Sequence, residues 1–205
     1  MKLTEWQEDV LKETFNIGVG RASASISEMA GCEVVLSVPE AYICDLSKLI
    51  SDVAKLEQSR KLSAVIQRYS GPFEGTAMML YSEQSSLELV RLIMGSDTPA
   101  EQLSELENDA LCELGNIVLN SCLSCLGTLF SAEIETSLPE LLSGTTSQVL
   151  TLDGKVDPSK QVVFLKMGFR LAVGHLQGYL SFILDTDKIK NLIDCLNSYY
   201  EKASA

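Results

Sequence analysis

The sequence predicts an α/β fold of the α+β kind, with long helices packed on a mainly antiparallel sheet and two halves related by pseudo-two-fold symmetry. One polar pattern occurs twice, offset by 100 residues, and after each copy consecutive apolar strands look like hairpins. Hairpin strands pair antiparallel, and long buried helices cover the faces of a sheet. Neither half alone has enough strands to bury its apolar surface. We therefore expect one domain, residues 1–205, made of two internal repeats at about 1–97 and 98–205.

The repeated pattern consists of an aspartate, a glutamate, an asparagine and a proline at fixed steps. The first copy is Asp9, Glu13, Asn16 and Pro39, and the second is Asp109, Glu113, Asn116 and Pro139. Both copies have steps of four, three and twenty-three residues. At about 100° per residue, the first three positions share one stripe of a helix. Each half is therefore expected to carry the same polar helix face.

Both long helices are expected to start just before the pattern. Thr4 is followed by Gln7, and Ser104 by Glu107. Each pair has the spacing of a capping box, in which the hydroxyl accepts from the third helical amide and the longer side chain reaches back. Small and apolar residues downstream predict that both helices are mostly buried.

The remaining elements are expected in a similar order in each half. Strands are predicted over 33–38 and 133–138, each ending at its proline, because proline cannot donate a ladder hydrogen bond. The first half then predicts a helix over 46–56, paired strands over 62–69 and 73–81, a helix over 82–94 and a junction over 95–99. The second half predicts a loop and strand near 148–152, paired strands over 162–171 and 176–184, and a helix over 186–200.

Composition excludes several classes of function. The formal net charge of −12, with no basic stripe, argues against binding of nucleic acid or anionic membranes. No apolar run reaches the roughly 18 residues of a membrane span, so no membrane insertion is expected. The first residues turn acidic where the apolar part of a signal peptide would begin, which predicts a cytoplasmic protein.

Cys122 and Cys125 form a CxxC motif that a metal or redox site could use. A second ligand pair is missing, and the equivalent positions of the first half are Ala22 and Ser25. Small residues at both places indicate close helix packing instead, since a free cysteine behaves as a small buried hydrophobe.

Gly18 and Gly20 form a GxG within the first helix. No strand precedes them, so a dinucleotide-binding loop is not expected. They are better explained by the close approach of another backbone. The second half has Val118 and Asn120 at these positions, so the two helix faces are not identical.

The polar stripe itself indicates a limited chemistry. A carboxamide donates and accepts hydrogen bonds and can orient a water molecule, whereas it is a poor general base. A glutamate one turn away can pair with a cation. Phosphoryl transfer suits such a face, because its catalysis is mostly alignment and electrostatics, and a partner protein could supply the remaining groups.

The doubled Asp-x3-Glu-x2-Asn-x22-Pro pattern resembles the CheC class of the CheC/CheX/FliY phosphatases over essentially the whole chain. The resemblance implies hydrolysis of the aspartyl phosphate on a CheY-type response regulator in chemotaxis two-component signalling. Asn16 and Asn116 would then position water, and Glu13 and Glu113 would pair with a lysine of the regulator. The resemblance further implies that Asp9 and Asp109 flank the sites, and that Pro39 and Pro139 shape their edges. Mg²⁺ is expected on the regulator, with no cofactor or metal in this chain, and a CheD deamidase is a possible further partner.

Two alternatives remain. A non-catalytic interaction module is possible, because flagellar switch proteins have a similar fold but lack the Glu and Asn pattern. A hydrolase with paired carboxylates, such as a glycosidase, could use Asp9 and Glu13 on their shared face. No aromatic sugar platform lies near these two residues in the sequence, which favours the phosphatase.

Overall fold

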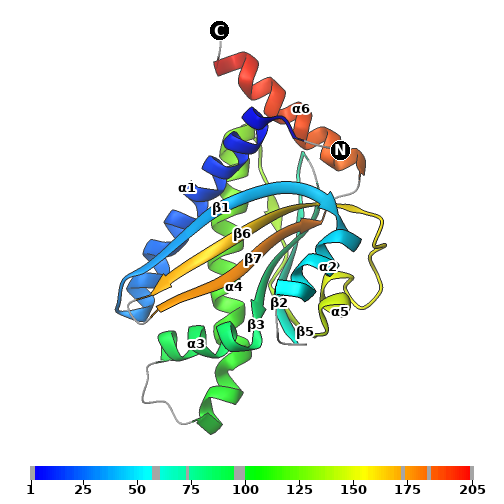
Figure 1. Cartoon of the computed structure of the whole chain (residues 1–205). Helices are drawn as coiled ribbons and strands as arrows, with labels where there is room; N and C mark the ends of the chain where they lie inside the picture. Colours follow the sequence, from blue (N-terminus) through cyan, green and yellow to red (C-terminus); the bar gives the residue numbers. More distant parts are fainter. Residues whose placement is uncertain are drawn as a thin grey trace.

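The protein is described by a computed structural model over residues 3–56, 61–72, 74–94, 100–171, 174–183 and 186–203. It has one seven-stranded sheet with helices on both faces, and every strand pair is antiparallel (Figure 1). The predicted α/β fold with an antiparallel sheet is confirmed. The elements in chain order are α1 (Glu5–Ala30), β1 (Val34–Asp45), α2 (Leu46–Leu56), β2 (Leu62–Ser70), β3 (Gly75–Ser82), α3 (Glu83–Met94), α4 (Ala100–Phe130), β4 (Glu135–Thr136), β5 (Glu140–Gly144), α5 (Thr146–Leu150), β6 (Gln161–Leu171), β7 (Gly174–Ile183) and α6 (Thr186–Ala203).

The strand order is β1-β6-β7-β3-β2-β4, with β5 also paired to β2. The hairpin of each half therefore lies beside the edge strand of the other half, and the two hairpins meet at β3 and β7. This is the order that two-fold-related halves would give. The division into two repeats stays a prediction, and its expected junction at 95–99 lies outside the described residues.

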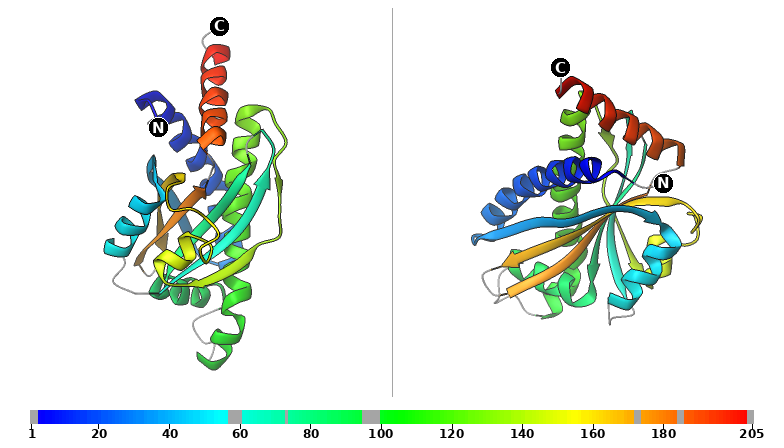
Figure 2. Two further views of the ribbon diagram at one scale, coloured as in Figure 1. Left: turned by 90° about the vertical axis from the view of Figure 1, so that its right-hand side faces the viewer. Right: turned by 45° about the horizontal axis from the view of Figure 1, so that its top comes forward.

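The two faces of the sheet are covered by different helices. α1 and α4 pack together on one face, where Phe15 of α1 lies with its ring centroid 5.1 Å from that of Phe182. α2 and α5 lie on the opposite face, over a second core that includes Leu49 and Val149 (Figure 2). α6 packs at the start of α1, where Gln7 Nε2 donates to Asn197 Oδ1 at 2.9 Å. The polar pattern therefore lies on the central helix pair.

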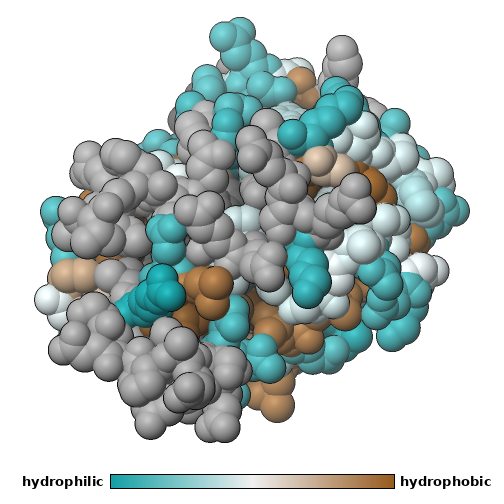
Figure 3. Space-filling view, turned by 60° about the horizontal axis from the view of Figure 1, so that its bottom comes forward, coloured by the Kyte–Doolittle hydropathy of each residue, from teal (hydrophilic) through white to brown (hydrophobic). Residues whose placement is uncertain are grey.

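α3 closes one end of the helix layer against α4. Its Leu89 and Val90 are fully buried in the core under the long helices. Figure 3 views the molecule from the side of this end, and its described surface mixes hydrophilic residues with smaller hydrophobic areas. The apolar side of α3 is thus used for packing within the chain.

The two long helices approach closely at Gly18. A Cβ atom at this position would lie 2.9 Å from the Cys122 Cα, whereas a Cβ at Gly20 would meet no atom within 4 Å. Cys122 and Cys125 are both buried and free, and burial raises the pKa of the Cys122 thiol above its usual range. The prediction that the CxxC serves packing is confirmed, and the close backbone approach is confirmed at Gly18 but not at Gly20.

One of the two expected capping boxes is present. Gln7 N donates to Thr4 Oγ1 at 3.3 Å, and Thr4 N donates to Gln7 Oε1 at 2.9 Å. The second box is wrong, because α4 begins at Ala100 and already includes Ser104. Glu107 instead accepts a hydrogen bond from Ser86 Oγ at 3.1 Å, which ties α3 to α4.

Three strand predictions also need correction. β1 does not end at Pro39 but continues to Asp45, which an edge strand permits because its outer N–H groups need no partner. The strand expected over 133–138 is reduced to Glu135–Thr136. The strand expected near 148–152 is wrong, because a capping box between Thr145 and Gln148 starts the short helix α5.

Within the described part of the chain, one helical stretch, Glu107–Phe130, has the length and composition of a membrane span, with a mean hydropathy of 1.3. In the fold, 61% of the apolar 18-residue window in this stretch is buried inside the protein. Its apolar character is explained by its packing against both α1 and the sheet.

Gly18→Ala is expected to be less stable than Gly20→Ala. Alanine is favoured over glycine in a helix by about 1 kcal/mol, and at Gly20 the new methyl group meets nothing within 4 Å. At Gly18 the methyl group meets the Cys122 backbone, and such overpacking costs about 1–3 kcal/mol. Chemical denaturation measures both unfolding free energies, and equal values would contradict the close approach at Gly18.

Candidate functional site

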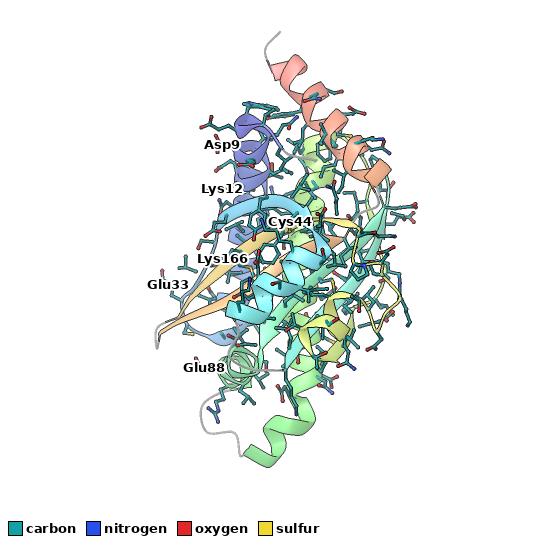
Figure 4. All side chains as sticks on the ribbon, turned by 45° about the vertical axis from the view of Figure 1, so that its right-hand side comes forward. Asp9, Lys12, Glu33, Cys44, Glu88 and Lys166 are labelled. Carbon is teal, nitrogen blue, oxygen red and sulfur yellow. The ribbon has the colours of Figure 1, made fainter. Side chains whose placement is uncertain are left out.

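The first copy of the pattern lies along α1. Asp9 and Glu13 are exposed and Asn16 is half-buried. Asp9 points away from the ribbon (Figure 4). Neither carboxylate makes an ion pair or hydrogen bond with a described residue, so both are available to an external cation.

Asn16 is held by the backbone of β1. Val38 N donates to Asn16 Oδ1 at 2.8 Å, and Asn16 Nδ2 donates to the Val38 carbonyl at 3.4 Å. The ladder pairs Ser37 with Gly168 and then Glu40 with Lys166, so β1 has one residue more than β6 at this point. Such a bulge leaves backbone groups outside the ladder, and the Asn16 carboxamide satisfies those of Val38.

The second copy lies along α4, where Asp109 and Glu113 are exposed and Asn116 is half-buried. Asn116 is held by side chains. Its Oδ1 accepts from Gln67 Nε2 at 3.0 Å and from Asn120 Nδ2 at 2.7 Å. Its Nδ2 has no hydrogen-bond partner within the described ranges. The same residue type is therefore fixed through different atoms in the two halves.

The two residues that donate to Asn116, Gln67 and Asn120, are themselves held by further hydrogen bonds. Gln67 Nε2 also donates to the Ser137 carbonyl at 3.2 Å, and Thr136 Oγ1 donates to Asn120 Oδ1 at 3.1 Å. Ser137 in turn is bonded to β2, since its amide donates to the Arg68 carbonyl at 2.9 Å. The network connects α4 to the edge of the sheet.

The second edge of the sheet has the same interruption as the first. β2 pairs Tyr69 with Thr136 and Ile66 with Glu140, so the outer chain has one residue more than β2 between these pairs. Pro139 lies in this stretch and separates β4 from β5. Both prolines of the pattern therefore lie where an edge strand carries an extra residue. The side chain of Pro39 is outside what the structure describes.

The residues that face the two interruptions differ. Gln67 lies on β2 between Arg68, whose carbonyl accepts from Ser137 N, and Ile66, which pairs with Glu140. Met167 has the equivalent position on β6, between the residues that pair with Ser37 and Glu40. Their side chains are buried to the same extent, with 1% and 0% exposed. The Met167 thioether has no hydrogen to donate to a carboxamide, so only the second half can hold its asparagine in this way.

An ion pair follows each proline. Glu140 Oε1 lies 2.8 Å from Arg68 Nη1, and Glu40 Oε1 lies 3.6 Å from Lys166 Nζ. Glu140 and Arg68 are each 60% exposed, so their pair contributes at most about 1 kcal/mol to stability. These glutamates keep the offset of 100, as do Ser37 and Ser137, so the matched positions extend beyond the four-residue pattern.

Two hollows lie beside the long helices. A groove of about 770 Å³ opens between α1, α6 and the end of α4, and Glu13 and Ile17 are among its lining residues. A second hollow of about 540 Å³ is lined by residues that include Asn120 and Thr136. Neither lining includes both a glutamate and an asparagine of one pattern, so the candidate sites are exposed helix faces and not enclosed pockets.

The site residues match an alignment role better than covalent chemistry. Each face offers an exposed glutamate and a fixed carboxamide, three residues apart on a helix. Among the described residues, no group of three or more His, Cys, Asp or Glu side chains could hold a metal ion. Sequence reasoning identified the glutamates and asparagines but missed Gln67, whose only sequence signal is that it differs from Met167 at the offset of 100.

The chain is similar to several known chemotaxis proteins. The family model described as chemotaxis phosphatase CheX matches residues 63–157. The CheY-P phosphatase CheC of Bacillus subtilis is 25% identical over 142 residues, which is 68% of this chain and 67% of that protein. The flagellar motor switch phosphatase FliY of the same organism is 25% identical over 178 residues, or 85% of this chain and 44% of that protein. The chain thus spans less than half of FliY.

Solved structures share the fold. FliY from Thermotoga maritima matches with a TM-score of 0.78 and 20% identity, over 97% of this chain and 100% of that one. CheX from Borrelia burgdorferi, solved in a complex with CheY, BeF3 and Mg²⁺, matches with a TM-score of 0.50 and 15% identity, over 84% of this chain and 96% of that one. With the family model and the two curated relatives, these matches make the chain similar to proteins of the CheC/CheX/FliY family, and the solved structures show that it shares their fold.

Proposed function

We propose that this protein is a hydrolase that removes the phosphoryl group from the aspartate of a CheY-type chemotaxis response regulator. The carrying observation is that two helix faces each present a hydrogen-bonded, half-buried asparagine three residues after an exposed glutamate. The relatives named CheY-P phosphatase CheC and flagellar motor switch phosphatase FliY support the same activity.

The asparagines are proposed to position water. Hydrolysis of an aspartyl phosphate needs a water molecule in line with the scissile bond, and the rate gain comes mainly from alignment. Asn16 and Asn116 are half-buried and fixed by hydrogen bonds, so either side chain loses little further conformational freedom when it enters a partner's site. A pre-organised carboxamide is suited to this task.

The glutamates are proposed to anchor the partner. Glu13 and Glu113 are exposed, and neither pairs with a described cation, so each can accept an ammonium group of the regulator. Asp9 and Asp109 lie one turn earlier and extend the negative face. Together with the formal net charge of −12, these groups favour a regulator surface with a lysine at its centre.

Mg²⁺ is expected on the regulator and not on this chain. The CheX complex that contains CheY also contains Mg²⁺, which is consistent with a metal supplied by the partner. We further propose that the protein acts in the cytoplasm. Binding of a CheD-type deamidase stays a proposal that rests on the family resemblance alone.

A non-catalytic interaction module is the second candidate. The relative FliY is named for the flagellar motor switch, where protein contacts could be the main role. A stable complex with the phosphorylated regulator, without faster loss of phosphate, would favour this candidate over the phosphatase.

Asn16→Ala and Asn116→Ala are each expected to lower the rate of phosphate loss from the phosphorylated regulator, and the double variant should lose about 100-fold or more. Asn16→Ala also leaves Val38 without its side-chain partner, which costs about 1–3 kcal/mol, so the assay is run well below the unfolding midpoint. Radiolabelled phosphate release measures the rate.

Asn108→Ala is the matched control for both variants, because Asn108 is exposed on α4 two turns before Asn116. Its activity should equal that of the wild type. Wild-type activity in the Asn16→Ala, Asn116→Ala double variant would contradict the proposed role of the carboxamides.

Glu13→Gln combined with Glu113→Gln is expected to raise KM about fivefold while kcat changes little. An exposed charge pair contributes up to about 1 kcal/mol to docking, and salt screens it. Steady-state kinetics at two ionic strengths measures both constants, with the exposed Glu8→Gln as control. A drop in kcat at unchanged KM would assign the glutamates to chemistry and contradict an anchoring role.

A further inference from the structure

We propose that Gln67 and Asn120 are positioning residues of the second site. They hold the Asn116 carboxamide by its oxygen, so that its nitrogen is the atom offered to the docked regulator and donates to the attacking water. The role in turnover rests on the proposed function, whereas the orientation of the carboxamide can be measured without it.

The orientation follows from one acceptor that cannot change. The Ser137 carbonyl can only accept, so the Gln67 group that lies 3.2 Å away must be its nitrogen. The same nitrogen lies 3.0 Å from Asn116, which must therefore present its oxygen. Asn120 lies 2.7 Å from this oxygen and must therefore present its nitrogen as a second donor, which leaves its own oxygen to accept from Thr136 Oγ1 at 3.1 Å.

The buried position of Gln67 leaves one of its polar atoms without a partner. The side chain is 1% exposed, and its Oε1 has no hydrogen-bond partner within the described ranges. A buried carbonyl without a partner is unfavourable, and an apolar residue of similar size would avoid it. What the glutamine adds is a pair of donors directed at Asn116 and Ser137.

The first half of the chain supplies the natural comparison. At the offset of 100, Met167 corresponds to Gln67 and Gly20 corresponds to Asn120. Met167 is fully buried in the core under the long helices, so that environment accepts a thioether. Asn16 therefore lacks both side-chain anchors and is bound to the Val38 backbone through its oxygen and its nitrogen.

The consequence for catalysis is a defined hydrogen-bond direction. A water molecule that attacks phosphorus uses one oxygen lone pair, and its other lone pair can accept from an N–H group. Asn116 Nδ2 has both hydrogens available within the described structure, so it can hold this water without turning. Without Gln67 and Asn120, the carboxamide would rotate and the water would lose its fixed direction.

Gln67→Met tests the positioning role, because it gives the second half the residue that the first half already has. The substitution is made in the Asn16→Ala background, where only the second site remains, and in the Asn116→Ala background, where only the first remains. With phosphorylated regulator as substrate, we expect kcat to fall about 10-fold in the first background with KM nearly unchanged, because Glu113 is untouched. In the second background, no further loss is expected.

A purely structural role of Gln67 would change both backgrounds alike or follow the unfolding midpoint. Equal fractional losses in the two backgrounds, or no loss in the Asn16→Ala background, would overturn the proposal. Asn120→Gly, which copies Gly20, should reproduce the effect with a smaller loss, because one of the two donors remains.

Side-chain amide NMR of the unmodified chain separates this inference from the proposed function. The Gln67 Nε2 hydrogens should be protected from exchange with water, and the Asn116 Nδ2 hydrogens should exchange rapidly. Gln67→Met should shift the Asn116 side-chain signals and leave those of Asn16 in place. Protected Asn116 hydrogens would overturn the orientation even if the phosphatase is active. The expected spectra without any phosphatase activity would remove the proposed function and leave the orientation standing.

Discussion

Each edge of the sheet carries one residue more than its neighbouring strand, and the backbone groups of that extra residue must find partners. On the first edge the Asn16 carboxamide supplies them to Val38, the residue before Pro39. This contact explains why asparagine and proline stand a fixed distance apart in the sequence. The helix must place its carboxamide where the proline has interrupted the ladder. The spacing of the pattern is therefore set by how a long helix crosses the edge of the sheet.

The same constraint is met in a second way at the other edge. Gln67 stands between Asn116 and the interrupted chain, and bonds to both. The asparagine no longer completes the edge itself, and its nitrogen is left without an internal partner. Two faces with the same glutamate and asparagine thus differ in which atoms of the carboxamide remain available. Residues outside the pattern decide this difference.

Most of the elements could be predicted from the sequence, because hairpins and amphipathic helices have local signals. The failures have local causes as well. α4 extends back to Ala100 because none of residues 100–103 stops a helix, and Glu107 bonds to Ser86 instead of serving as a cap. β1 continues past Pro39 because an edge strand tolerates a proline. The single sheet with strands from both halves could be predicted because neither half has enough strands to bury its apolar surface alone.

The site was only half predictable, for a different reason. Glu13, Asn16, Glu113 and Asn116 follow helix spacing, which the sequence displays directly. Gln67 lies 49 residues from Asn116, and the two meet only through the packing of α4 on β2. A Cβ at Gly115 would lie 2.4 Å from the Val65 Cβ, so this helix sits unusually close to the strand beside the site. Such a long-range contact depends on how α4 packs on β2, which the local pattern of neither element displays.

The effect of Gln67 on packing can be judged from the residue at the corresponding position of the other half. Met167 occupies the corresponding place and is fully buried, so hydrophobic packing can fill that position. The glutamine keeps a carbonyl oxygen in the core without a partner among the described residues, which packing alone would not favour. Its amide hydrogens reach one edge carbonyl and one asparagine of the polar pattern. The second face therefore combines an exposed glutamate with a carboxamide whose direction is set by contacts within the chain.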